Sequence, residues 1–369
     1  MIKLFSPIKV GGLELVNRIA ISPMCQYMAK ADGKVTPWHT MHYGSLAVSG
    51  AGVVIIEASA VSPEGRISPC DLAIYNADQE EHFRELLSNI RTYSSTPIGL
   101  QLAHAGRKSS SEPFDSPNPV TIEQGGWIPI GPSSVRVKEN WPAPNEMSLT
   151  DIDDVIASFV SAATRADRAG FDLIEIHGAH GYLISSFLSN IANLRTDKYG
   201  GSLEHRMLFA ITLARAVRKV WPRSKAIGFR LNGSDWVESG ISVEETAKVA
   251  AKLKDIGIDY VSVSSGGNSS NQKLPPVTPG YQAPLAASVR KLSGLTTMAL
   301  GMILEGPQAE GILSSGQADL IGIARAALDN PRWPLHAAQS LGVKVEYPRP
   351  HWRAASGIWP GYDIVHKKG

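Results

Sequence analysis

Eight short apolar segments, separated by stretches long enough for a helix, constrain the fold more than any other feature of this chain. In the clearest of those stretches, 151–169, Ile152, Ile156 and Phe159 recur at steps of three or four residues, which is typical of an amphipathic helix. Apolar strands that alternate with such helices predict a parallel sheet covered by helices. Eight units over about 320 residues match a closed (β/α)8 barrel, the TIM barrel, better than an open sheet. The predicted strands are 18–23, 53–58, 98–103, 173–177, 227–231, 260–264, 297–301 and 320–324.

Capping residues predict where two of the helices begin and end. Thr150 is the expected N-cap of helix 151–169, and Gly170 ends it, because glycine readily adopts the left-handed conformation that terminates many helices. A second helix begins at the capping box S-V-E-E, 242–245, and ends at Gly257. The resulting order of strand, helix and strand is the order that a barrel requires.

Two segments lack the period of either a helix or a strand. Residues 106–148, after the third predicted strand, are rich in proline, serine and glycine, and a loop of this length is usually functional or carries small strands of its own. We expect it to be a lid or subdomain over the barrel mouth, within one barrel domain that spans 1–369. The tail 342–369 is rich in arginine and tryptophan, which are enriched at interfaces, so it is either a contact between subunits or packed on its own barrel.

Composition excludes several classes of protein. A net charge of +2 without a block of lysine and arginine gives no electrostatic signature of nucleic-acid or membrane-surface binding. Cys25 and Cys70 are too few for a disulfide framework or for an iron–sulfur cluster held by four cysteines. Pro7 and Lys9 interrupt the N-terminus before an apolar signal segment forms, and no apolar run approaches the roughly 20 residues of a membrane span. We expect a cytoplasmic protein that is neither secreted nor embedded in a membrane.

Polar residues gather at the carboxyl ends of the predicted strands, where the loops of a TIM barrel build the active site. The fourth strand runs into I-E-I-H-G-A-H-G-Y, which brings His177, His180 and Tyr182 close together in the sequence. A lone histidine here is more often a core or loop residue, whereas two histidines beside a tyrosine can donate hydrogen bonds and transfer a proton. Gln101 and Arg230 lie at the ends of the third and fifth strands. Gln101 adds an amide that both donates and accepts hydrogen bonds, and Arg230 adds a permanent positive charge.

The loops after the last two strands of such barrels commonly bind phosphate. Gly301, Ala324 and Arg325 lie in these loops, where small residues let backbone N–H groups approach a phosphate and arginine adds a charge-assisted bond. The alternative is ordinary helix-entry chemistry at Gly301 and a surface position for Arg325. The three residues therefore predict a local phosphate site.

Five motifs follow one another along the chain: N-R-I-A-I-S-P-M-C-Q-Y from Asn17, E-A-S-A-V-S-P-E-G-R from Glu57, Q-L-A-H-A-G-R-K from Gln101, I-E-I-H-G-A-H-G-Y-L from Ile174 and N-L-R-T-D-K-Y-G-G-S from Asn193. Together they resemble the old yellow enzyme family, specifically its bacterial branch of NADPH dehydrogenases and xenobiotic reductases that places a cysteine beside the flavin. The resemblance implies a TIM barrel that binds FMN and oxidises NADPH, or less readily NADH. It also implies reduction of the carbon–carbon double bond of α,β-unsaturated carbonyl compounds, with nitro compounds as a further class of acceptor.

The resemblance also implies roles for individual residues. Substrate would contact Tyr27, His177 and His180, and Tyr182 matches the position proposed in the family as proton donor. Cys25 would tune the flavin potential and the fit of the substrate; its alternative is a buried, inert thiol. Ala324 departs from the family, which usually has glycine there. FMN would be held by Ser22, Pro23, Met24, Cys25, Ala58, Gln101, Arg230 and the pair Ala324 and Arg325.

Subunit contacts are implied as well. The family's cysteine-bearing branch often sends a C-terminal arginine or tryptophan into the neighbouring subunit's site, and Arg349, Trp352 and Arg353 are the candidates here. A homodimer or homotetramer is therefore expected, with a nicotinamide nucleotide and a small-molecule enone as the binding partners.

Two other functions are compatible with a barrel of this kind. A metal-dependent hydrolase would use His104, His177 and His180 as zinc ligands, although the chain lacks the H-x-H on the first strand and the carboxylate after the eighth that such enzymes carry. The expectation is therefore that no metal is bound. A non-catalytic flavin sensor on the same fold would bind FMN without being reduced by NADPH.

Overall fold

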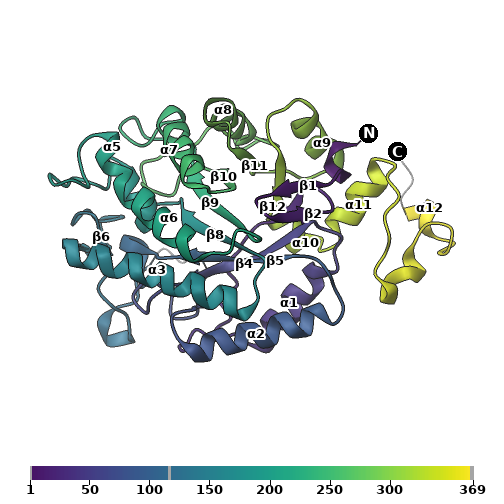
Figure 1. Cartoon of the computed structure of the whole chain (residues 1–369), viewed down its shortest axis with the longest axis horizontal. Helices are drawn as coiled ribbons and strands as arrows, with labels where there is room; N and C mark the ends of the chain where they lie inside the picture. The colour runs from purple at the N-terminus through teal and green to yellow at the C-terminus, as the bar shows by residue number, and fades with distance from the viewer. Residues whose placement is uncertain (1, 115–117, 366–369) are drawn as a thin grey trace.

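The structure, a computed structural model, describes residues 2–114 and 118–365. Eight parallel strands close into a barrel, in which the hydrogen-bonded order β10-β11-β12-β3-β4-β5-β8-β9 returns to its starting strand. The predicted TIM barrel is thereby confirmed, and helices cover the sheet from outside (Figure 1). The barrel strands are β3 (Ile19–Ile21), β4 (Val53–Ala60), β5 (Ile98–Ala103), β8 (Leu173–Gly178), β9 (Ala226–Asn232), β10 (Tyr260–Ser264), β11 (Thr296–Ala299) and β12 (Leu320–Ile323).

At least one helix follows each barrel strand, which gives the crossover connections that parallel strands require. The fourth crossover, from β8 to β9, carries three α-helices, and each of the other six carries a single α-helix. The helices in chain order are α1 (Pro37–Ala47), α2 (Ala77–Arg91), α3 (Leu149–Ala169), α4 (Leu183–Leu188), α5 (Leu203–Arg206), α6 (Leu208–Val220), α7 (Val243–Ile256), α8 (Ala283–Ser293), α9 (Gly306–Ser314), α10 (Arg325–Asp329) and α11 (Trp333–Ser340).

The strands are apolar on both faces because each face packs against a different layer. Val53, Ile55 and Tyr260 belong to the cluster inside the barrel, whereas Val54 and Ile56 belong to the larger cluster between the strands and the helices. The antiparallel hairpin of β1 (Ile8–Val10) and β2 (Leu13–Leu15) adds Val10 and Leu15 to the inner cluster. The hairpin therefore covers one end of the inner cluster.

Most of the predicted helix caps are confirmed, and one is wrong. Gly170 and Gly257 end α3 and α7 with φ values of 102° and 90°, and Ser242 forms the expected capping box with Glu245. The N-cap of α3 is Ser148 rather than Thr150, so the helix begins at Leu149. Ser148 takes this role because its hydroxyl accepts a hydrogen bond from the Asp151 N–H while the Asp151 carboxylate binds back to Ser148.

The segment 106–148 carries only short elements. They are the 3₁₀ turns η2 (Gly106–Lys108) and η3 (Ile122–Gln124) and the strands β6 (Ile130–Gly131) and β7 (Asn145–Glu146), which pair in parallel. Residues 115–117 of this segment lie outside the described residues. The function of the segment as a lid stays a prediction.

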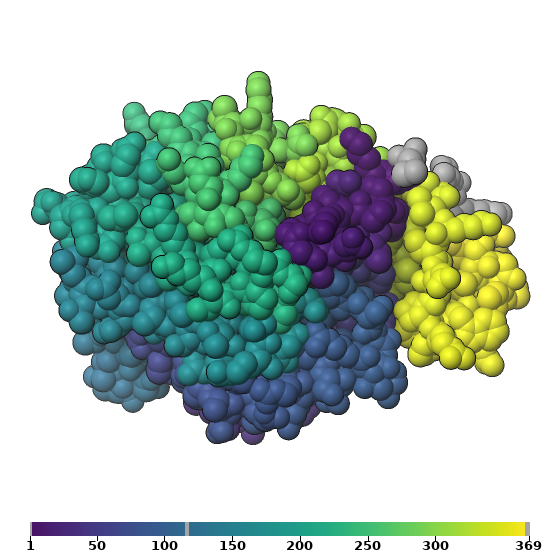
Figure 2. Space-filling view, viewed as in Figure 1, coloured from purple at the N-terminus to yellow at the C-terminus, as the bar shows by residue number. Residues whose placement is uncertain are grey.

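The tail beyond Gly342 lies at the edge of the barrel rather than in its core. Its two elements, η4 (Arg349–Ala354) and α12 (Tyr362–Val365), contain no buried residue, and Trp352 and Trp359 are 50% and 40% exposed. Figure 2 shows the yellow C-terminal residues at one side of the molecule, next to the purple N-terminal segment. The predicted contact between subunits is untested, and 366–369 lie outside the described residues. Within 2–114 and 118–365, no helix combines the length and the apolar character needed to cross a membrane.

Candidate active site

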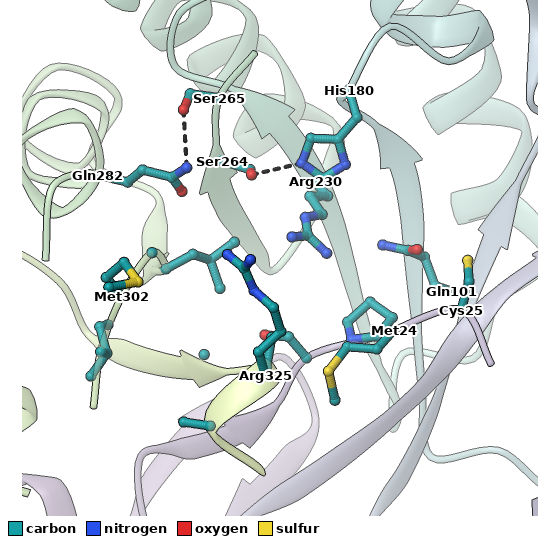
Figure 3. A pocket seen from close by; sticks show the side chains of 18 of the residues that line it. Met24, Cys25, Gln101, His180, Arg230, Ser264, Ser265, Gln282, Met302 and Arg325 are labelled. Atoms are coloured by element: carbon teal, nitrogen blue, oxygen red, sulfur yellow. Dashed lines mark hydrogen bonds between the residues drawn. The ribbon is translucent and has the colours of Figure 1, made fainter. Parts of the chain in front are cut away.

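A cavity of about 580 Å³ opens at the carboxyl ends of the barrel strands. Figure 3 shows the side chains of Gln101, Arg230 and Arg325 converging on the same space. All of the residues predicted from the sequence to bind the cofactor, bind the substrate or take part in catalysis lie in its wall. They are Ser22, Pro23, Met24, Cys25, Tyr27, Ala58, Gln101, His177, His180, Tyr182, Arg230, Gly301, Ala324 and Arg325.

Two imidazole rings and a phenol share one wall of this cavity. The ring centroid of His177 lies 5.1 Å from that of His180 and 4.9 Å from that of Tyr182. The Ala179 N–H donates to Nδ1 of His177 over 3.2 Å, so the neutral ring of His177 carries its proton on Nε2. Burial, together with the charge of Arg230, holds the pKa of both histidines well below the ordinary value of 6.5. Both rings are therefore neutral hydrogen-bonding groups at neutral pH.

The loop after β8 has an unusual backbone that fixes His180. His180 itself has φ 59°, in the left-handed region, and its N–H donates to Oδ1 of Asn232 over 3.1 Å. Gly181 follows with φ 74°, and a Cβ there would lie 2.4 Å from the Gly267 carbonyl oxygen, so only glycine fits between the two loops. On its ring, Nε2 of His180 lies 2.7 Å from Oγ of Ser264 (Figure 3).

Gln101 is positioned by a buried acid, Glu175, that the sequence analysis missed. Gln101 pairs with Glu175 in the β5–β8 register, and its Nε2 donates to Oε1 of Glu175 over 2.7 Å. The other carboxylate oxygen, Oε2, accepts from Tyr260 Oη at 3.1 Å and from Ser262 Oγ. Burial lowers the pKa of Arg230, and the negative charge of Glu175 opposes that shift. The sequence feature that could have identified Glu175 is that it is the single acidic residue in an otherwise apolar strand.

The three residues predicted to bind phosphate also line this cavity. Gly301 has φ 94°, and a Cβ there would lie 2.9 Å from Cγ of Gln282, which explains the glycine. Ala324 has φ −118°, outside the region that favours glycine, so alanine is compatible with this backbone. Arg325 is the first residue of α10. Further lining residues that the sequence analysis did not assign to the site are Ser264, Ser265, Tyr281, Gln282, Leu300, Met302, Ile303, Leu304, Gly322, Ala326 and Leu328.

The donor set fits a polar cofactor with a negatively charged group. Oγ of Ser22 and Nε of Arg230 are buried, and neither has a hydrogen-bond partner among the described residues. Both line the cavity, so a ligand with polar edges would satisfy them. His104, the third histidine of the hydrolase alternative, faces Glu64 at 3.7 Å and is absent from the cavity wall. In the described part of the chain no three His, Cys, Asp or Glu side chains are grouped so as to hold a metal ion.

Comparison with known proteins identifies the family of this chain. Residues 3–343 match the NADH:flavin oxidoreductase / NADH oxidase family. The chain is 43% identical to NADPH dehydrogenase of Geobacillus thermodenitrificans over 346 residues, which cover 94% of this chain and 96% of the relative. It is 40% identical to NADPH dehydrogenase of Bacillus subtilis over 347 residues, 94% of this chain and 97% of that relative.

Solved structures show the shared fold. An old yellow enzyme homologue from Zymomonas mobilis is 24% identical, with a TM-score of 0.77 over 92% of this chain and 94% of that one. Morphinone reductase is also 24% identical, with a TM-score of 0.76 over 99% of this chain and 98% of that one. The resemblance of the sequence motifs to the old yellow enzyme family is thus confirmed. The chain belongs to the NADH:flavin oxidoreductase / NADH oxidase family and is an FMN-dependent oxidoreductase, similar to relatives that are named NADPH dehydrogenase.

Proposed function

We propose that this enzyme reduces the activated carbon–carbon double bond of α,β-unsaturated carbonyl compounds. The observation that supports the proposal best is the pair of neutral imidazoles, 5.1 Å apart between centroids, beside Tyr182 in the wall of the cofactor cavity. An acceptor of this class needs donors for its carbonyl oxygen and a proton for its α-carbon. One wall of the cavity supplies both.

FMN, once reduced by NADPH, supplies the hydride that this reaction requires at the β-carbon. Residues of the chain would hold it: Gln101 and Arg230 at the ring edge, with Arg325 and the Gly301 loop at the phosphate. A permanent cation such as Arg230 stabilises the negative charge that a reduced ring carries. Glu175 keeps Gln101 in place through the 2.7 Å bond described above.

His177 and His180 would bind the carbonyl oxygen of the acceptor. Negative charge develops on that oxygen during the reaction, and a preorganised neutral N–H stabilises it without a proton being transferred. For His177 the proton is already on Nε2, because Nδ1 accepts from the Ala179 N–H. For His180 a hydroxyl proton donated by Ser264 to Nε2 would leave the ring proton on Nδ1.

Tyr182 would donate the proton to the α-carbon. Its ring stands edge to face with His177, at an interplanar angle of 84°, and Nζ of Lys108 lies 5.0 Å from its centroid. A nearby cation stabilises a phenolate and so makes the hydroxyl a better acid. Cys25 packs against the same small cluster as Tyr182, which includes Ala58 and Ala103, and would tune the cofactor and the substrate fit.

The remaining expectations concern the protein's surroundings. We infer a cytoplasmic homodimer or homotetramer in which Arg349, Trp352 or Arg353 contacts the neighbouring subunit. The exposure of the tail supports this inference, because Trp352 is 50% exposed on one isolated chain. Light scattering of the full chain and of a chain ending at Leu341 would test this inference. The same number of subunits in both proteins would contradict a contact made by the tail.

A half-reaction experiment tests the proposed activity. The purified protein should be yellow, and anaerobic NADPH should bleach its flavin absorbance. Cyclohexenone or a maleimide should then restore the absorbance with formation of the saturated product. If the flavin absorbance returns only when oxygen is admitted, the proposed substrate class is contradicted. If NADPH does not bleach the flavin absorbance at all, the protein is better explained as a flavin sensor.

A further inference from the structure

Glu57 is a buried acid whose side chain points away from the cofactor cavity. In the pairing of β4 with β5, Ile56 lies opposite Leu100 and Ala58 lies opposite Gln101, so Glu57 is an extra residue that forms a β-bulge. Ile55 faces the barrel interior, and regular alternation would turn Glu57 to the same side. The bulge instead gives Ala58 the inward position, and the Glu57 carboxylate lies against α1.

Hydrogen-bond donors surround the Glu57 carboxylate on both oxygens. Oε2 accepts from the backbone N–H of Gln26 at 2.7 Å, and Oε1 accepts from Tyr43 Oη at 2.9 Å. Tyr43 in turn accepts the Glu57 N–H at 3.0 Å, so the two residues are bonded twice. Glu57 is only 1% exposed, and its nearest ion-pair partner is a histidine rather than lysine or arginine.

His39 completes this cluster from α1. Its Nδ1 accepts the Thr36 N–H at 2.9 Å, which leaves the proton of the neutral ring on Nε2. Nε2 lies 3.5 Å from Oε1 of Glu57 and has no hydrogen-bond partner among the described residues. Burial lowers the pKa of His39 to about 4 and raises that of Glu57 to about 8, so at neutral pH the His39 ring is neutral and the Glu57 carboxyl group is mostly protonated. A buried carboxyl group costs free energy unless hydrogen bonds satisfy it, as the Gln26 N–H and Tyr43 Oη do here.

The residue that Glu57 binds lies between two residues of the cavity wall. Cys25 and Tyr27 flank Gln26, and both line the cavity. Tyr27 has φ 54°, a left-handed conformation that a tyrosine adopts only when neighbouring contacts impose it. The Glu57 bond to the Gln26 N–H comes one residue before this turn. The Gln26 side chain also accepts from Nε1 of Trp38, which ties the same loop to α1.

We propose that Glu57 is a positioning residue, which acts through the Gln26 amide to set Cys25 and Tyr27 against the cofactor and the acceptor. This inference builds on the proposed ene-reductase function. Without the carboxylate, the loop 23–27 would lose the contact that fixes its turn, while the strand ends that carry Gln101, Arg230 and the two histidines would stay in place. The effect should therefore fall on Cys25 and on acceptor binding, and much less on FMN.

Replacement of Glu57 in the FMN-loaded enzyme tests this inference. All variants are made in a Cys70→Ser background, so that Cys25 is the remaining thiol, and its alkylation by iodoacetamide is followed by mass spectrometry. Glu57→Ala should change that rate at least fivefold and raise the KM for cyclohexenone about tenfold, with kcat and bound FMN changed less than threefold. Glu57→Gln keeps an oxygen that can accept the Gln26 N–H and should stay within twofold of the parent. Glu310→Gln, at an acid that binds the N-terminal backbone far from the cavity, is the matched control.

If the Glu57→Ala variant does not fold, Glu57→Asp takes its place in the test. The aspartate side chain is shorter and cannot reach the Gln26 N–H, so this variant should behave like Glu57→Ala. Unchanged alkylation and unchanged KM in whichever of these two variants folds would overturn the inference, even if the melting temperature falls. The alkylation rate is measured without turnover, so it reports on Glu57 independently of whether cyclohexenone is a substrate. Failure of the parent enzyme to turn over cyclohexenone would count against the proposed function instead.

Discussion

The rings of His177 and Tyr182 lie edge to face with their centroids 4.9 Å apart, so an imidazole and a phenol share one wall of the cavity. The two groups come from opposite ends of one short segment, and the left-handed turn at His180 and Gly181 brings them together. This relationship connects the local sequence to the proposed chemistry, because an acceptor bound to the imidazole lies beside the phenol.

Replacing both histidines should abolish the activation of the acceptor. A donor to a developing oxyanion contributes about 3 kcal/mol, or about a hundredfold in rate, so His177→Ala with His180→Ala should lower enone reduction by at least about a thousandfold. FMN should remain bound, and the charge-transfer band that phenols form with the flavin should disappear. His205→Ala, at an exposed histidine of α5, is the control. Turnover retained by the double variant would remove the oxyanion role.

Tyr182→Phe should slow only the step that needs a proton. General acid catalysis typically contributes a hundredfold or more, so we expect the reoxidation of the reduced enzyme by cyclohexenone to slow about a hundredfold. Reduction by NADPH should be unchanged within about twofold. Stopped-flow absorbance separates the two steps. Equal slowing of both half-reactions would point to a general disturbance of the cavity rather than to a lost proton donor.

The pH dependence should show no titration of the site histidines near neutrality. Their pKa values are lowered by burial and by Arg230, and an imidazole is neutral at every pH above its pKa. The neutral donors should therefore persist as pH falls from about 7.5 to about 5.5, and kcat/KM should lack a limb near the ordinary histidine pKa. Such a limb in the parent enzyme, absent from the His177→Ala variant, would show that His177 titrates normally.

Arg325 should bind the phosphate of the cofactor. Losing a charge-assisted hydrogen bond costs about 1.5–3 kcal/mol, so Arg325→Ala should weaken FMN roughly tenfold to a hundredfold. Riboflavin, which has no phosphate, should be weakened less than about twofold. Titration of the apoprotein by flavin fluorescence measures both affinities, and Arg84→Ala on the outer face of α2 is the matched control. Equal losses for the two ligands would contradict a phosphate contact.

Local patterns were sufficient to predict the barrel strands and most of the cavity wall. The eight strands are apolar on both faces, and the residues at their carboxyl ends meet because the fold brings those ends together. The N-cap of α3 was missed because Thr150 and Ser148 are both good caps, and only the reciprocal bonds with Asp151 distinguish them.

The buried acids could not be predicted, because their partners come from distant parts of the chain. Glu175 binds Gln101 and Tyr260, which are 74 and 85 residues away. Glu57 owes its orientation to a β-bulge, and the sequence of one apolar strand does not reveal where its pairing with the neighbouring strand shifts. Gln282 lines the cavity from the N-cap position of α8, where its neighbours indicate only the beginning of a helix.

The reoxidation of the NADPH-reduced enzyme by two matched acceptors tests the central claim most directly. Cyclohex-2-enone carries the carbonyl oxygen that His177 and His180 would bind, whereas cyclohex-2-enol has the same ring and double bond without it. Under anaerobic stopped-flow conditions, we predict rapid return of the flavin absorbance with the enone, one equivalent of cyclohexanone per flavin, and no return with the enol. Equal rates with the two acceptors, or return only after oxygen is admitted, would contradict the account.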